Sequence, residues 1–182
     1  MNDYAYLAIQ FSMAVAVYLM IYRTYLKPWF QAQDFAGAVM PLLMLHVFRY
    51  LGLALLVTGQ VDAAVPRDAL SIMAYGDLAS GVCALICVIA IAARSRFVVP
   101  LVALFSLVGI ADLITIGPTA LNAGVITSPI GTMWFFLVAF APLLLLSHLY
   151  ILGRLVGHIR SGGGMQAEAR QSRPDPVGDD RP

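Results

Sequence analysis

Five apolar stretches, separated by short polar segments, run along the chain at roughly residues 4–22, 36–58, 69–93, 97–117 and 130–153. An apolar helix of about 20 residues is long enough to cross the hydrocarbon core of a bilayer. The first stretch has no basic residue before it and no small-x-small cleavage site after it, so we interpret it as a retained helix rather than a signal peptide. The pattern predicts an all-α integral membrane protein, with a bundle of five transmembrane helices in residues 1–160.

The composition agrees with a protein whose main partner is the lipid bilayer. Hydrophobic residues make up 60% of the 182 residues and charged residues only 12%, whereas a soluble domain carries roughly 25% charge. The formal net charge of +1 provides no basic surface for nucleic acid. We therefore expect a multi-pass protein of the cell membrane that binds no nucleic acid. The compositional bias toward Ala, Val, Leu and Arg favours a bacterial inner membrane.

Basic residues near the helix ends predict the orientation of the bundle. Six of them share one side of a five-span bundle, and only Arg67 lies near a helix end on the other side. The six are Arg23, Lys27, Arg94, Arg96, Arg154 and Arg160. Lys and Arg accumulate on the cytoplasmic side of membrane proteins. The N-terminus is therefore predicted outside the cell and the C-terminus in the cytoplasm.

The connections between the spans carry further information. The very short connection at residues 94–96 predicts that spans three and four form an antiparallel hairpin. The connection from Pro118 to Pro129 has no charge; we expect a surface loop there, with a lid folded over the bundle as the alternative. Residues 161–182 are rich in Gly, Pro and charge, which predicts a disordered cytoplasmic tail.

Ionisable residues inside the spans are the best candidates for a functional site, since each charge at the bilayer centre costs about 2.5–3.5 kcal/mol. The candidates are His46, Arg49, Asp77, Asp112 and His148. At a rise of about 1.5 Å per residue, Arg49 and the two Asp residues share the outer half of the bundle. One guanidinium offers enough donors for two carboxylates. The first span carries no such residue, so we expect a peripheral helix.

Arg49 with Asp77 and Asp112 sums to a charge of −1 when the histidines are neutral. A protonated carboxyl group, a protonated His46 or a cationic ligand would balance this charge, and a hydrogen-bonding ligand would satisfy the carboxylate that has no fixed counter-charge. An ideal helix places His46, Arg49 and Tyr50 toward one direction, so Tyr50 joins the candidate ligand-binding residues.

Three residues, Tyr75, Trp134 and His148, are secondary candidates for contact with a ligand. Tyr75 precedes Asp77 by two positions, which places them about 160° apart on an ideal helix and on different faces. Trp134 begins the last span and is expected to be an interfacial anchor, with stacking on a ligand as the alternative. His148 lies about five residues from the predicted cytoplasmic end of its span, apart from the other ionisable residues.

A b-type haem bound through His46 and/or His148 is one alternative reading, because His is a frequent axial ligand. The predicted depths of these two residues differ by roughly 7 Å. The sequence contains no metal-ligand motif such as HExxH.

Three hypotheses for the function follow from these residues. The favoured one is binding of a small or amphipathic ligand at the His/Arg/Asp cluster, with Asp77, Asp112 and His46 as candidates for acid–base chemistry on it. The second is proton-coupled transport of a small molecule by a homo-oligomer. The third is an accessory subunit of a larger membrane complex, in which Arg49 and the carboxylates only hold helices in register.

Overall fold

The structure, a computed structural model, describes residues 2–171 and is all-helical, with no strand among these residues. Five helical segments are long and apolar enough to cross a membrane. They are Asp3–Ala32, Phe35–Leu56, Arg67–Ala92, Val98–Asn122 and Met133–Gly162. The five predicted helices are therefore confirmed, with ends that differ from the predicted ends by several residues.

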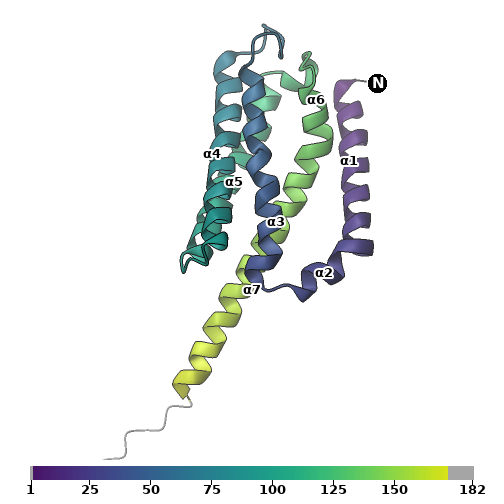
Figure 1. Ribbon diagram of the computed structural model, residues 1–182. Coiled ribbons are helices and arrows are strands. Elements are labelled where there is room, and N and C mark those ends of the chain that lie inside the picture. The colour runs from purple at the N-terminus through teal and green to yellow at the C-terminus, as the bar shows by residue number, and fades with distance from the viewer. Residues whose placement is uncertain (1, 172–182) are drawn as a thin grey trace, which may run out of the picture.

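The first segment lies at the side of the bundle. It consists of α1 (Asp3–Ile21), the π-helical turn η1 (Tyr22–Leu26) and α2 (Lys27–Ala32). No residue of α1 is buried, and Figure 1 shows α1 beside the last segment and apart from α4 and α5. The Tyr18 hydroxyl donates to the carbonyl oxygen of Ala139 at 2.9 Å. The expectation of a peripheral first helix is confirmed.

The second segment changes its helical type halfway along. It begins as α3 (Phe35–Val47) and continues as the 3-10 helix η2 (Phe48–Leu56), where the sequence predicted one α-helix. A 3-10 helix has three residues per turn, so every third side chain points the same way. The buried residues of η2 are Arg49, Gly52 and Leu55, which have this spacing.

The third and fourth segments form the predicted hairpin. Helices α4 (Arg67–Ala92) and α5 (Val98–Asn122) pack side by side and are joined by a tight turn, seen at the end opposite the N-terminus in Figure 1. Arg94 has a φ of 51° in this turn, and the Ser95 N–H donates to the carbonyl oxygen of Ala90 at 2.9 Å. This hydrogen bond and the positive φ of Arg94 reverse the chain within a few residues.

The uncharged connection after α5 folds over one end of the bundle. Helix α5 continues past Pro118, and Gly124, at a φ of 68°, turns the chain into the short 3-10 helix η3 (Val125–Thr127). Val125 and Ile126 are buried there. These two apolar side chains pack inward, as the lid alternative expects, whereas Leu121, Asn122 and Pro129 of the same connection are exposed.

The last segment consists of α6 (Met133–Phe135), the π-helical turn η4 (Phe136–Phe140) and α7 (Ala141–Gln171). Helix α7 runs well beyond the other helices at the end opposite the N-terminus (Figure 1). The sequence predicted the span to end near 153 and disorder from 161, whereas the backbone is helical to Gln171. Extending an existing helix costs far less than starting one, and Met, Gln, Ala, Glu and Arg after residue 164 are good helix formers. The rest of the predicted tail, 172–182, lies outside the described residues.

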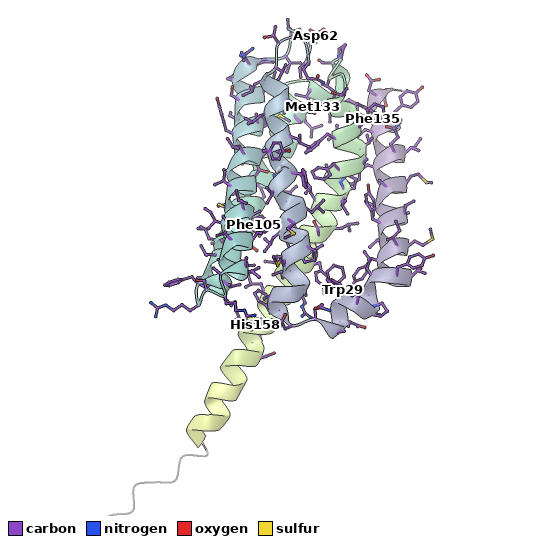
Figure 2. The ribbon with its side chains drawn as sticks, in the orientation of Figure 1. Trp29, Asp62, Phe105, Met133, Phe135 and His158 are labelled. Atoms are coloured by element: carbon purple, nitrogen blue, oxygen red, sulfur yellow. The ribbon has the colours of Figure 1, made fainter. Side chains whose placement is uncertain are left out.

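Two apolar clusters hold the bundle together. The lower cluster packs α3, α4, α5 and α7 around Val39, Leu43, Ala84, Cys87, Val102, Phe105, Ile151 and Leu155. The upper cluster, at the end that carries the N-terminus, consists of Leu55, Val65, Leu70, Met73, Ala74, Val125 and Ile130. Figure 2 shows Phe105 in the lower half of the bundle and Met133, which packs against the upper cluster, near the opposite end.

Candidate functional site

A cavity of about 320 Å³ lies inside the bundle, next to the upper cluster. This volume is at the lower end of the range of about 300–1,000 Å³ found for small-molecule sites. Residues of α3, η2, α4, α5, η3 and the last segment line it. Most of the lining is apolar and includes Leu55, Met73, Ile116, Ile126, Met133 and Leu144.

All five ionisable residues singled out in the spans line this cavity, and each is buried. We call them the polar cluster: His46, Arg49, Asp77, Asp112 and His148. The sequence placed His148 apart from the others, and this expectation is wrong. Because α7 continues to Gln171, His148 lies near the middle of its apolar segment rather than near the end.

Arg49 bridges the two carboxylates, as the sequence predicted. Its Nε–H donates to Asp77 Oδ1 at 2.8 Å, and its Nη2–H donates to Asp112 Oδ2. The bridge joins η2 to both α4 and α5. One guanidinium thus faces two carboxylates in a site that is largely shielded from solvent, and the formal charge of the three groups sums to −1.

The two histidines of the cluster have unused hydrogen-bonding capacity. The Ser147 hydroxyl donates to the carbonyl oxygen of Leu144 at 3.0 Å, so its oxygen accepts from His46 Nε2–H, also at 3.0 Å. This makes His46 Nδ1 an acceptor, and no described group bonds to it. Both ring nitrogens of His148 likewise have no partner among the described residues.

Three glycines make room for polar side chains of the cluster. A Cβ atom at any of these positions would overlap a carboxylate or an imidazole on a neighbouring helix. The pairs are Gly52 with Asp77, Gly76 with Asp112, and Gly109 with His148. Sequence analysis did not identify these pairs. The available signal was glycine inside a helix, which costs about 0.5–1 kcal/mol relative to alanine and calls for a packing reason.

The 3-10 winding of η2 decides which residues of the second segment reach the cavity. His46, Arg49, Gly52 and Leu55 follow one another at every third position, and all four line it. Tyr50 is 45% exposed and does not line the cavity. The expectation that Tyr50 shares the face of Arg49 is wrong, because the winding turns Tyr50 about a third of a turn away.

The remaining aromatic candidates also lie outside the cavity. Tyr75 is 58% exposed, as its angular separation from the buried Asp77 predicts. The Trp134 Nε1–H donates to Gln10 Oε1 at 2.8 Å. Trp134 therefore connects the last segment to α1 and is not placed to stack on a molecule in the cavity.

The cavity opens between α5 and the last segment. On α5, the lining residues Leu113 and Leu121 are 48% and 53% exposed, and Gly117 between them is exposed as well. Phe136 and Leu145 line the cavity from the last segment and are half-buried. We call this opening the mouth. Its exposed residues on α5 run from Leu113 to Leu121.

The arrangement of the two histidines does not fit a haem held by both of them. Their rings are in edge-to-face contact, with centroids 5.5 Å apart. Phe105 packs against both, with its centroid 5.0 Å from that of His46 and 5.2 Å from that of His148. A macrocycle ligated by both imidazoles has to lie between them, and this packing leaves no space for it.

A family model described as a domain of unknown function (DUF8737) matches residues 6–156, a stretch that contains the whole polar cluster and the cavity lining. No curated protein and no solved structure matches the chain.

Proposed function

We propose that this chain, which belongs to the DUF8737 family of unknown function, is a multi-pass protein of the cell membrane that binds a small amphipathic ligand in its cavity. The observation that carries the proposal is that the polar cluster borders an internal space and has hydrogen-bonding capacity left over. The apolar walls would take the hydrophobic part of the ligand, and the cluster its polar end.

A purely structural role explains less of this arrangement. An ion pair that only holds helices in register needs the bridge between Arg49 and the two carboxylates and nothing more. Here His46 and His148, which that bridge does not use, also line the cavity, and the described residues offer no partner to three of their buried ring nitrogens. Buried polar groups are costly without a hydrogen-bond partner. A ligand that supplies those partners removes this cost.

The mouth indicates how such a ligand enters. In a bundle that spans the bilayer, an opening between two helices would let a lipid-soluble molecule pass from the lipid into the cavity without crossing water. Its polar end then meets the cluster deep in the bundle. Any acid–base step on the bound molecule would fall to His46, Asp77 and Asp112, the acid–base candidates that the sequence named and that line the cavity.

The proposal is tested by native mass spectrometry of the protein extracted gently with its lipids. The blocking variant is Gly117→Phe, since Gly117 lies in the mouth and a Cβ there meets nothing within 4 Å. The matched control is Gly153→Phe, at a helical glycine with equally open surroundings that does not line the cavity.

We expect a small-molecule adduct on the original protein and on Gly153→Phe, and its loss from Gly117→Phe. An adduct that survives in Gly117→Phe, or a folded protein that carries none, contradicts the proposal. A second protein bound in fixed stoichiometry, without a small molecule, would favour an accessory subunit instead.

A further inference from the structure

The geometry points to a cationic ligand: a single-chain amphiphile whose head is a primary ammonium group, held by the polar cluster. This inference rests on the proposed function and names the chemical class of the ligand. It follows from the charge of the cluster, from the hydrogen-bonding groups left free there, and from the apolar lining of the rest of the cavity.

The formal charge of the cavity is not balanced when both carboxyl groups are ionised. Among the described residues that line it, the fixed charges are those of Arg49, Asp77 and Asp112, which sum to −1. Removing an ion from water costs several kcal/mol even after the protein relaxes around it. A ligand with one positive charge brings the sum to zero, whereas an anionic head raises it to −2.

The free hydrogen-bonding groups are mostly acceptors. Among the described residues, His46 Nδ1 has no donor, and the neutral His148 ring has one acceptor nitrogen and one N–H without a partner; all three atoms are buried beside the cavity. Arg49 bonds to Asp77 Oδ1 and Asp112 Oδ2. The second oxygens lie against glycines that have no side-chain donor. A primary ammonium group has three donors and no acceptor, which matches this set.

The remainder of the cavity suits one hydrocarbon chain. The lining from Leu55 and Met73 to the mouth at Leu121 is apolar. The volume of about 320 Å³ favours a compact molecule. A phospholipid with an amine in its head would bring a phosphate close to the two carboxylates, where its negative charge is repelled. The inference is therefore a free alkylamine rather than a lipid headgroup.

The test is a competition between three probes that share a ten-carbon chain: decylamine, decanol and decanoate. The protein in an uncharged detergent receives equal concentrations of all three, and native mass spectrometry resolves the adducts by mass. We expect at least ten times more decylamine than either other probe. Equal or greater binding of decanol or decanoate overturns the inference while the proposed function stands. Binding of none of the three counts against both.

Charge-neutralising variants test whether the carboxylates cause the preference. Asp112→Asn keeps the shape of the side chain and brings the formal charge of the cluster to zero, so the preference for decylamine should fall at least tenfold. Asp68→Asn is the matched control, at an exposed residue in the first turn of α4. Asp77→Asn serves as the second variant if Asp112→Asn does not fold. An unchanged preference in the folded variant overturns the inference.

A fourth probe separates the two sources of an amine. Lysophosphatidylethanolamine carries the same primary amine beside a phosphate on a single chain. We expect it to lose the competition against decylamine, because its phosphate meets the carboxylates. If it binds as well as decylamine, the ligand is a lipid headgroup and the assignment to a free amine is wrong.

Discussion

Gly76 offers the most direct test of how the polar cluster is packed. It lies in α4, and a Cβ at this position would overlap Asp112 Oδ1 on α5. The substitution Gly76→Ala adds only that atom. The Asp112 carboxylate must then move, and its bond with Arg49 is the first contact to be disturbed.

Three contributions of opposite sign set the change in the free energy of unfolding that Gly76→Ala causes. Glycine to alanine inside a helix stabilises by about 1 kcal/mol on propensity alone. Overpacking a well-filled site costs about 1–3 kcal/mol, and losing a hydrogen bond to a charged group costs about 1.5–3 kcal/mol. The unfavourable terms win, so we expect Gly76→Ala to lower the free energy of unfolding by roughly 2–4 kcal/mol.

The assay is reversible unfolding in mixed detergent micelles, followed by circular dichroism. The control is Gly117→Ala in α5, where a Cβ meets nothing within 4 Å. It should be neutral or stabilising, by up to about 1 kcal/mol.

A double-mutant cycle separates crowding at Asp112 from any general effect on α4. With Asp112→Ala already present, the atom that the new methyl group overlaps is gone. Gly76→Ala should then cost nothing or stabilise slightly. The reasoning is refuted if Gly76→Ala costs the same in both backgrounds, or if it costs no more than Gly117→Ala.

Two further predictions concern the histidine pair and the orientation. Ser147→Ala leaves His46 Nε2 without its acceptor and should lower the free energy of unfolding by about 1–3 kcal/mol. Ser106→Ala removes a buried hydroxyl that has no partner among the described residues, so it should be neutral or stabilising in the same unfolding assay. Equal costs of the two substitutions would contradict this. The orientation is tested by cysteine labelling in a background that lacks the two native cysteines. Thr58→Cys should react with a membrane-impermeant maleimide in intact cells, whereas Ser161→Cys should react only after lysis. The reverse labelling pattern would show the opposite orientation.

Much of the fold could be predicted from the sequence, because the free energy of transferring a helix into lipid is approximately the sum of the transfer free energies of its residues. That sum identifies five long apolar helices without knowledge of their neighbours. The predicted first span, residues 4–22, contains no Asp, Glu, His, Lys or Arg, which marked it as peripheral. The short connection at residues 94–96 required the hairpin of α4 and α5.

Part of the site could be predicted for a related reason. A charge in an apolar helix must find a partner at its own depth, and residue counting gave similar depths for Arg49, Asp77 and Asp112. His148 was misplaced because its depth was counted from an end of the helix that the sequence does not mark. A small error in one boundary moves a residue by a full turn.

By itself, then, the sequence determined the helices, their order and the ion pairs that burial demands. The tertiary structure decided which residues face the cavity. The change from α to 3-10 in η2 keeps Arg49, Gly52 and Leu55 in line and turns Tyr50 outward. An α-helix and a 3-10 helix differ by about 20° per residue, small enough for packing against a neighbouring helix to choose between them. That choice depends on which side chains meet across the bundle, and no local pattern in the chain records it.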